Sequence, residues 1–458
     1  MNVPEKLIEK YNVPVPRYTS YPPANFFDTG YNEKNFTEAV IRSNEEGMEN
    51  ISIYMHIPFC PQLCHYCGCN THITRNEELK SNYLDALKKE IAMLRPLLKN
   101  GRKVSQVHWG GGTPNSLTIN QITDIMMFIR NQFSFTEHPE IAIECNPAHL
   151  NHEYVESLIG LGFNRISLGV QDFSDKVLNT INREIPVIPV SKFVGQIQSS
   201  GKAKVNLDFI YGLPHQTEGS FRETIEKAIA LNPDRLVTFS YAHIPNIKKS
   251  QKILEKPGLP SALEKLKMFE TTYQLMKEAG YIPIGLDHFA KSDDELAIAI
   301  QNRNLHRNFQ GYCTRETTGQ VYAFGATGIS QLENGYAQNT NHVSDYIRQI
   351  NDGHFTTEKG YVLTYEEKII RHVITELMCN YYISWEQTAV KYGLSIEKVK
   401  NLVGYNEVGL EGFKDDKLLS FDNNEVQVSE LGRFFIRNIA ASFDPGLIKE
   451  GKTYSKAL

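Results

Sequence analysis

Strand-like and helix-like segments alternate along most of the first 250 residues of this 458-residue chain. Apolar runs rich in β-branched residues predict strands at 51–57, 104–110, 140–146, 165–171, 204–213 and 235–243. Longer amphipathic stretches between them predict helices, for example at 82–98, 120–133 and 220–231. This alternation favours a parallel sheet, because parallel strands need a crossover connection. We therefore expect an α/β fold, a complete or partial (βα)6 barrel, with its functional groups at the carboxyl ends of the strands.

The two ends of the chain have a different pattern. Residues 1–35 are rich in Pro and Tyr and show little periodicity, which predicts an arm. Towards the C-terminus the pattern predicts several helices, then a hairpin around Asp422 and Asn423 and a final helix. We thus expect an N-terminal arm over the site at 1–35, the barrel at 36–350, and a mainly helical, winged-helix-like domain at 351–458.

Composition and charge exclude several classes of protein. Hydrophobic residues make up 41% and charged residues 22%, which is ordinary for a globular protein. The net charge of −5 argues against a general nucleic-acid binder. No apolar run approaches the roughly 18 residues of a membrane span, and the N-terminus lacks the pattern of a signal peptide. We expect a cytoplasmic protein with no nucleic-acid partner and no membrane span, and nothing demands more than a monomer.

Four of the seven cysteines lie within ten residues, in the segment HIPFCPQLCHYCGCN. An odd and sparse number of cysteines does not build a disulfide framework. Thiolates this close in sequence suit zinc or an iron–sulfur cluster. A structural zinc site more usually has two C-x2-C pairs, and this chain has one such unit. The C-x3-C-x2-C spacing therefore favours a [4Fe-4S] cluster with three cysteine ligands and one open iron, with zinc as the alternative.

Longer motifs extend this interpretation to most of the chain. The C-x3-C-x2-C motif after the first predicted strand resembles the radical S-adenosylmethionine (SAM) superfamily. The strings PRYTSYP, YMHIPFC, HWGGGTPNSL, GFNRISLGVQDF, LDFIYGLPHQT and HRNFQGY are similar to those of the oxygen-independent coproporphyrinogen III oxidases. The resemblance implies oxidative decarboxylation of two propionates of coproporphyrinogen III to vinyl groups, giving protoporphyrinogen IX. The implied cofactors are a [4Fe-4S] cluster and SAM, from which a deoxyadenosyl radical is generated.

The resemblance also implies roles for individual residues. Cys60, Cys64 and Cys67 are the expected cluster ligands, and Cys69 lies outside their motif. Two SAM molecules are implied. Residues expected to contact the first are Tyr54, Gly111 and Glu144. Residues expected to contact the second are Tyr66, Gly112, Thr113, Gln171, Arg183, Asp208, Ala242 and Ile329. Tyr66 and Cys69 are the candidate catalytic residues beside the second SAM.

Each residue type suits its expected partner, although simpler interpretations stay open. Carboxylates suit ribose hydroxyls, Arg183 suits a methionyl carboxylate, and the Tyr66 ring can stack on adenine. Asp208 lies in an apolar strand and needs a partner, which a buried Lys or Arg could also supply. Arg183 could be a solvated helix residue, the glycine run a tight turn, and Cys69 a packed thiol. Cys145 and the two later cysteines are expected to be packed thiols.

A substrate with four propionates requires a locally basic cavity in a net-negative protein. The candidate residues are Arg17, Lys291, His306 and Arg307, with Phe309 and Tyr312 as apolar surfaces for the macrocycle. Tyr18 and Tyr21 in the arm lead to the hypothesis that the arm closes over the site and excludes water. The reaction needs an electron donor and an electron acceptor, and the sequence identifies neither.

Three other functions are open at this point. One is a haem chaperone of the same superfamily, but those relatives usually have Phe where this chain has Cys69, and they lack RYTSYP. Another is a radical enzyme that opens haem anaerobically. The third is a zinc-stabilised winged-helix regulator, against which the acidic net charge counts. Metal analysis separates the regulator from the others.

Overall fold

The computed structural model describes residues 3–315, 319–447 and 454. Six parallel strands lie side by side in one sheet, in the order β1-β4-β5-β6-β7-β8. Their bounds are β1 (Ile51–Ile57), β4 (Lys103–Gly111), β5 (Ser134–Cys145), β6 (Arg165–Gln171), β7 (Lys204–Tyr211) and β8 (Arg235–Ser240). They coincide with the six predicted strands, so the predicted α/β class and its parallel βα units are confirmed.

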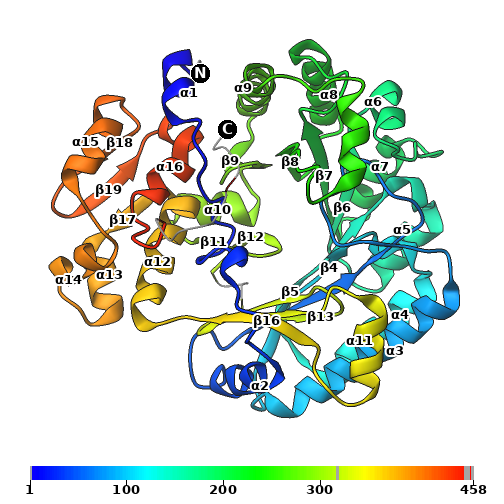
Figure 1. The fold of residues 1–458 in the computed structure, drawn as a ribbon. Coiled ribbons are helices and arrows are strands. Elements are labelled where there is room, and N and C mark those ends of the chain that lie inside the picture. Colours follow the sequence, from blue (N-terminus) through cyan, green and yellow to red (C-terminus); the bar gives the residue numbers. More distant parts are fainter. Residues whose placement is uncertain (1–2, 316–318, 448–453, 455–458) are drawn as a thin grey trace.

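The sheet is larger than the sequence predicts, with twelve strands in all. Beyond β1 it continues through β13 (Gln320–Phe324), β14 (Ile329–Leu332), β15 (Gly335–Asn339) and β16 (Thr357–Val362). Beyond β8 it continues through β10 (His288–Ala290) and β9 (Ile282–Ile284). These added strands have three to six residues each, which is too short for a period-2 pattern to stand out. Figure 1 shows the sheet curving into an incomplete barrel.

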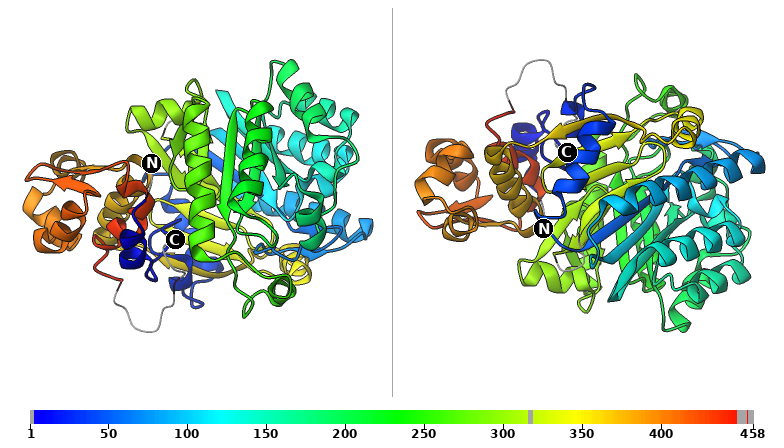
Figure 2. Two further views of the ribbon diagram at one scale, coloured as in Figure 1. Left: turned by 90° about the horizontal axis from the view of Figure 1, so that it is seen from above. Right: turned by 90° about the horizontal axis from the view of Figure 1, so that it is seen from below.

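Helices cover the outer face of the parallel strands (Figures 1 and 2). They are α3 (Glu77–Leu94), α4 (Ile119–Gln132), α5 (His152–Gly160), α6 (Asp175–Thr180), α7 (Val190–Ser199), α8 (Glu218–Ala230) and α9 (Ala262–Glu278). Side chains fix where several of them begin. At α4, the Gln121 amide donates to Thr118 Oγ1 (3.3 Å), and the Thr118 amide donates to Gln121 Oε1 (2.9 Å). This reciprocal pair, a capping box, satisfies two backbone amides that have no hydrogen-bond partner within the helix.

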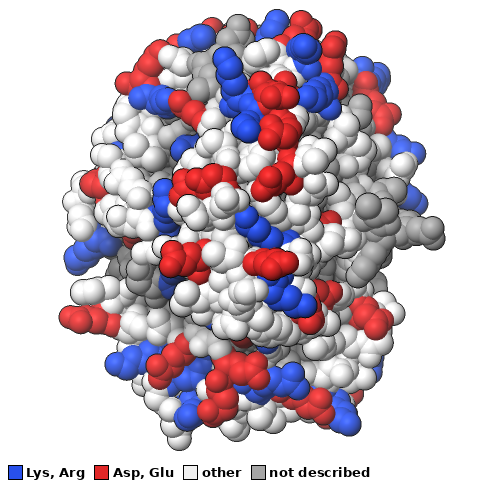
Figure 3. Space-filling model, turned by 90° about the vertical axis from the view of Figure 1, so that its left-hand side faces the viewer, with Lys and Arg blue, Asp and Glu red and all other residues white. Residues whose placement is uncertain are grey.

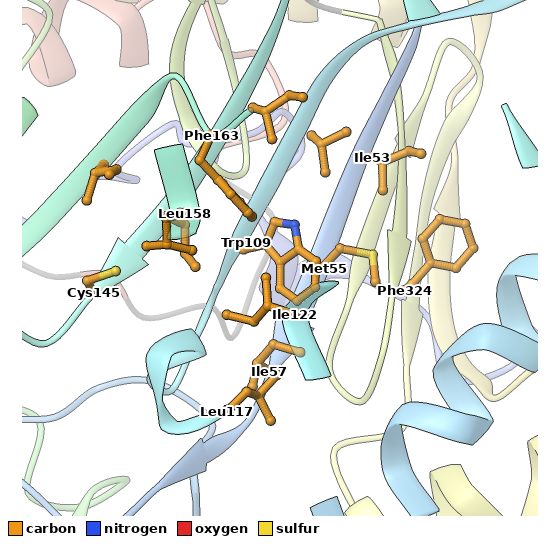
Figure 4. Close-up of a cluster of buried hydrophobic side chains, with 14 of the residues drawn as sticks. Ile53, Met55, Ile57, Trp109, Leu117, Ile122, Cys145, Leu158, Phe163 and Phe324 are labelled. Atoms are coloured by element: carbon orange, nitrogen blue, oxygen red, sulfur yellow. The ribbon is translucent and has the colours of Figure 1, made fainter. Parts of the chain in front are cut away.

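The main hydrophobic core lies between the sheet and these helices (Figure 4). Trp109 of β4 is fully buried at its centre, with its ring 6.1 Å from that of Phe163. Cys145 belongs to the same core, and Cys313 and Cys379 are also buried, so these cysteines are packed thiols as predicted. A close-packed layer on the outer face holds the ends of the strands in fixed positions.

Between the barrel strands and β13 the chain forms α10 (Glu295–Gln301) and a hairpin of β11 (Leu305–Asn308) and β12 (Gly311–Thr314). After β15 it forms α11 (Val343–Asn351), which packs on α3. In Figure 1 the hairpin and α10 lie inside the curve of the sheet, on its open side. No helix in the described part of the chain is long and apolar enough to cross a membrane.

The C-terminal region combines helices with a small sheet, as the sequence predicts. Its elements are α12 (Tyr365–Asn380), β17 (Tyr382–Ser384), α13 (Trp385–Tyr392), α14 (Ile396–Leu402), α15 (Glu407–Asp415), β18 (Leu419–Phe421), β19 (Glu425–Val428) and α16 (Ile436–Ala441). The predicted hairpin is β18–β19, and Asp422 Oδ1 accepts the amides of Asn424 (2.7 Å) and Glu425 (2.9 Å) in its turn. The strand order β17-β19-β18 gives a winged-helix-like arrangement.

The N-terminal residues pack on this C-terminal region. Helix α1 (Glu5–Tyr11), which the sequence pattern does not reveal, contributes buried side chains to the C-terminal core, and α2 (Glu33–Arg42) follows it. The Tyr18 hydroxyl donates to Asp444 Oδ2 (2.9 Å), and the Tyr21 hydroxyl donates to Asp444 Oδ1 (3.3 Å). Both tyrosines are buried, so their rings join the arm to the C-terminal region, and closure of the arm over the site stays a prediction.

Candidate functional site

The clustered cysteines lie at the end of β2 (Phe59–Cys60) and on the loop that follows it. Two neighbouring loops hold this cysteine loop in place. Asn182 Nδ2 donates to the Leu63 carbonyl (2.8 Å), and Gln251 Nε2 donates to the Tyr66 carbonyl (3.0 Å). Because these bonds use backbone oxygens of the loop, they position it without involving its thiols.

A cavity of about 330 Å³ opens between this loop and the carboxyl ends of the strands; we call it the cluster cavity. All four clustered cysteines line it. The other predicted site residues that line it are Tyr66, Gly111, Gly112, Thr113, Glu144, Gln171, Arg183 and Asp208. Residues from the ends of β4, β5, β6 and β7 therefore meet the cysteine loop at one place, as the barrel argument predicts.

Three predicted cofactor residues do not line the cluster cavity. Tyr54 lies beside it, with its ring 5.9 Å from that of His108. Ala242 follows β8 and lines a neighbouring cavity. Ile329 begins β14 and packs against an aromatic cluster that includes Phe27 and Tyr336. Contacts of Ala242 and Ile329 with a cofactor therefore stay predictions.

The glycine run after β4 lies against the strand that leads into the cysteines. The Gly112 amide donates to the Ile57 carbonyl (2.8 Å), and the Thr113 amide donates to the Phe59 carbonyl (3.0 Å). A Cβ atom at Gly112 would lie 2.6 Å from the Pro58 carbonyl oxygen, so this close approach requires glycine. Since both amides are already bonded, Gly112 and Thr113 can offer a ligand only carbonyl or side-chain atoms.

The cysteine thiols differ in their acidity. Burial raises the pKa of Cys60 to about 11. A hydrogen bond from Cys69 lowers the pKa of Cys67 to about 6. The Arg183 guanidinium donates to Cys64 Sγ at 3.8 Å. Thiolates are the form that binds metal, and Cys69 is the neighbour that favours the thiolate form of Cys67.

Two carboxylates face the cavity from neighbouring parts of the sheet. Glu144 Oε1 is 2.8 Å from His108 Nε2, and Asp208 Oδ2 accepts from Ser167 Oγ (2.7 Å). Burial raises the pKa of Asp208 to about 7. Among the described residues no Lys or Arg forms an ion pair with Asp208, so the simpler interpretation of this residue as half of a buried ion pair is not met.

His108 and Ser167 are site residues that the sequence analysis missed. His108 pairs with Tyr54 across β1 and β4, and Ser167 pairs with Glu144 across β5 and β6. Their only sequence signal is a polar side chain within a predicted strand. Its meaning depends on which strands are neighbours, and single-strand patterns do not contain that information.

Gln171 carries the clearest mark of a ligand site. It ends β6 with φ of +71°, in the left-handed region that is uncommon for residues other than glycine. Its Oε1 is buried and has no hydrogen-bond partner in the described part of the chain. A buried acceptor left in this way is costly unless a ligand donates to it. Nearby Arg183 donates to the Gly169 carbonyl (2.5 Å), so it is anchored at the site and is not a solvated helix residue.

The donor set fits an iron–sulfur cluster better than a single zinc ion. Zinc requires its thiolates at about 2.3 Å from one point, whereas a [4Fe-4S] cluster is held at separate iron corners. Three thiols on one loop, facing a cavity with a buried acceptor atom opposite, fit a cluster that carries a further ligand.

The residues considered for substrate binding lie in different places. Lys291 donates its amide to the Asp234 carbonyl before β8, so it lies at the amino end of that strand and outside the site. His306 and Arg307 line a separate cavity beside α12, and burial lowers the pKa of His306 to about 3. Arg17 pairs with Asp287 (2.7 Å) next to the cluster cavity.

Known families agree with this fold and site. The radical SAM superfamily matches residues 54–228, which contain β1, the cysteine loop and the strand ends of the cluster cavity. The fold and site thus define a radical SAM enzyme, a class that uses a [4Fe-4S] cluster and SAM.

Full-length comparisons are more specific. The chain is 41% identical to the oxygen-independent coproporphyrinogen III oxidase of Synechocystis, over 99% of this chain and 97% of the relative. It is 39% identical to that of Escherichia coli, over 97% and 96%. The solved coproporphyrinogen III oxidase of Escherichia coli, a radical SAM enzyme, superposes with a TM-score of 0.90 at 38% identity, covering 97% of this chain and 99% of that one. This chain belongs to the oxygen-independent coproporphyrinogen III oxidase family.

Proposed function

We propose that this protein converts coproporphyrinogen III to protoporphyrinogen IX without oxygen, by oxidative decarboxylation of two propionate side chains to vinyl groups. The reaction belongs to haem biosynthesis. The observation that carries the proposal is the cluster cavity, where a three-cysteine loop faces a buried, unsatisfied acceptor and two carboxylates at the strand ends. The chain also matches the oxidase family over nearly its whole length.

The cysteine loop holds the cluster through Cys60, Cys64 and Cys67. A [4Fe-4S] cluster held there would, together with SAM, supply the radical chemistry that takes a hydrogen atom from the β-carbon of a propionate. Cys69 lies two residues after Cys67, and its hydrogen bond to that thiol lowers the pKa of Cys67. Arg183, beside Cys64, provides a fixed positive charge that suits the carboxylate of a methionyl group.

The strand ends bind and orient the cofactor. Gln171 Oε1 accepts a hydrogen bond from a donor group of the ligand, which satisfies its buried oxygen. Glu144, positioned by His108, and Asp208, positioned by Ser167, accept from hydroxyl or amino groups. Tyr66, between two cluster ligands, offers a ring face for an adenine. Rigid placement of this kind is how a protein directs a radical to one hydrogen atom.

The electron balance requires two partners. Each propionate that becomes a vinyl group loses a hydrogen atom to the radical, then one electron and carbon dioxide. An electron donor must therefore supply the cluster, and an acceptor must take the substrate's electron.

The protein acts as a cytoplasmic monomer without a nucleic-acid partner. The seven cysteines form no disulfide, which suits a reducing compartment, and acidic and basic side chains are mixed over the face shown in Figure 3.

Anaerobic reconstitution tests this function. The protein is loaded with iron and sulfide and then given SAM, a reductant and coproporphyrinogen III, and the macrocycle is analysed by mass spectrometry. We expect loss of two carboxyl groups as carbon dioxide, with a vinyl group formed at each. Haem binding without turnover would instead identify a chaperone. Stoichiometric zinc without iron or sulfide in the protein would exclude both the oxidase and the chaperone and would favour the zinc-stabilised regulator.

A further inference from the structure

A second cavity of about 250 Å³ lies beside the cluster cavity, between the barrel and the C-terminal region; we call it the lateral cavity. Tyr211, at the carboxyl end of β7, lines one wall, and Arg433, just before α16, lines another. The loop after β8 connects the two cavities. Its Ala242 lines the lateral cavity, while its Gln251 binds the cysteine loop at the Tyr66 carbonyl (3.0 Å).

The lateral cavity is strongly basic. Its lining includes Arg17, Lys265, Arg433 and Arg437, and Asp287 is the single carboxylate among the described lining residues. Asp287 is already paired, because it accepts from Arg17 at 2.7 Å. This local excess of positive charge lies in a protein whose net charge is −5. A concave site of this kind concentrates anionic ligands.

Two of these cations form no ion pair with a described carboxylate. In the described part of the chain, no carboxylate forms an ion pair with Lys265 or Arg433. Lys265 Nζ donates to the Tyr241 carbonyl (3.0 Å), and the Arg433 guanidinium lies 4.4 Å from the centre of the Tyr381 ring. Arg433 Nε is buried without a hydrogen-bond partner. Partly buried cations without a counter-ion are costly, and an entering carboxylate would remove that cost.

Six aromatic side chains also line the lateral cavity. The rings belong to Tyr211, Tyr241, Phe269, Tyr273, Tyr381 and Phe434. Phe269 is at the centre of this group, 5.8 Å from Tyr211 and 5.5 Å from Phe434 between ring centroids. A ligand that matches this cavity therefore combines a large apolar ring system with carboxylates at its edge.

We propose that the lateral cavity binds a propionate-bearing edge of the macrocycle, with Lys265 and Arg433 as its carboxylate-binding residues. This inference rests on the proposed function and adds the residues that recognise the substrate. The segment after β8 lines the lateral cavity and is hydrogen-bonded to the cysteine loop of the cluster cavity. Propionates that do not react are anchored in the lateral cavity while a reacting one enters the cluster cavity. Binding energy from the anchored groups then positions the reacting group.

The test compares Lys265→Met and Arg433→Met with a matched control, Lys267→Met, which removes an exposed lysine from the same helix α9. Two probes are titrated by fluorescence: coproporphyrin III, which has four carboxylates, and its tetramethyl ester, which has none. We expect each of the two cavity variants to weaken binding of coproporphyrin III by about tenfold or more, because each removes a charged hydrogen-bond donor. Binding of the ester changes less than twofold, and Lys267→Met binds both probes like the wild type.

The two probes separate recognition from folding. If a variant loses acid and ester equally, its defect is structural and the proposed role is contradicted. If both cavity variants bind coproporphyrin III within twofold of the wild type, the role is also contradicted. Turnover separates this inference from the proposed function. Variants that keep the wild-type kcat/KM for coproporphyrinogen III overturn the inference alone, whereas an inactive wild type overturns the proposed function.

Discussion

The amino ends and the carboxyl ends of the parallel strands bury their charged residues in different ways. At the amino ends, Arg165 binds Glu140 and Glu295, each at 2.9 Å. Arg235 binds Glu295 at 2.7 Å, and its Nε donates to Asp294 at 2.9 Å. These opposite charges satisfy one another, and they hold the pKa of Glu140 near 2 although burial acts to raise it.

At the carboxyl ends the polar groups are left open. Asp208 has a serine as its hydrogen-bond partner, and Gln171 Oε1 has no partner among the described residues. Glu144, held by His108, is 44% exposed to the cluster cavity. The contrast shows how one set of strands serves two purposes. The ion pairs at the amino ends, which we call the closed network, stabilise the barrel. The polar groups at the carboxyl ends, which we call the open groups, are available to a ligand.

The largest effect that this comparison predicts is at the cysteine loop. Replacing Cys64 by Ser removes one of the three proposed cluster ligands, so we expect loss of iron and a fall in turnover of about a thousandfold or more, with little change in folding stability. Iron content, absorption spectra and product analysis measure this. Cys313→Ala is the control, because that thiol is packed away from the loop and its variant should retain iron. An active Cys64→Ser enzyme would contradict the ligand assignment.

The second prediction concerns the closed network at the amino ends of the strands. Arg165→Met leaves Glu140 and Glu295 without one of their cations, and we expect the free energy of unfolding to fall by about 3–5 kcal/mol. Urea unfolding of the protein measures the loss. Arg222→Met, on the exposed face of α8, serves as the control and should change stability by less than about 0.5 kcal/mol. An equally stable Arg165→Met protein would show that the network does not stabilise the barrel.

A smaller effect is expected for an open carboxylate. Glu144→Gln keeps the shape of the side chain but removes its charge, so we expect turnover to fall by about a hundredfold while the unfolding curve stays unchanged. Kinetics at varied SAM concentration, combined with thermal unfolding, test both parts. Glu137→Gln is the control, because Glu137 lies on the same strand β5 and is 89% exposed. A loss of stability comparable to that of Arg165→Met would remove the distinction between the two ends.

The smallest effect concerns pH. Folding raises the pKa of Asp208 to about 7 from an ordinary value near 3.8, so the folded protein favours the protonated form. Relative to Asp208→Asn, the wild type should lose stability as pH rises from about 4 to about 7, and change no further above that. We expect a difference of about 1 kcal/mol between pH 5 and pH 8, because the carboxyl faces an open cavity. If the free energy of unfolding changes with pH in the same way for the two proteins, the raised pKa of Asp208 is contradicted.

Much of the molecule could be predicted from local patterns. The six strands, the packed cysteines and the C-terminal hairpin all follow from periodicity, residue type or turn chemistry within a few residues. The strands β9, β10 and β13 to β16 could not, because each is short and is defined by its neighbour in the sheet. His108 and Lys291 show the same limit at the site. Strand pairing brings His108 to Glu144. Lys291, a candidate for substrate binding, lies at the amino end of β8 and outside the site.

The kind of chemistry could be predicted from local motifs. The spacing of Cys60, Cys64 and Cys67 indicated a cluster, because metal-ligand spacing within a single loop is a local property, and the resemblance of longer motifs to a known family implied SAM and a tetrapyrrole substrate. Which polar groups are satisfied depends on the packing of the whole chain. The closed network at Arg165, the open acceptor of Gln171 and the unpaired cations of the lateral cavity all depend on contacts between residues far apart in the chain. Burial and pairing are properties of the packed chain, and they distinguish a stabilising charge from one that binds a ligand.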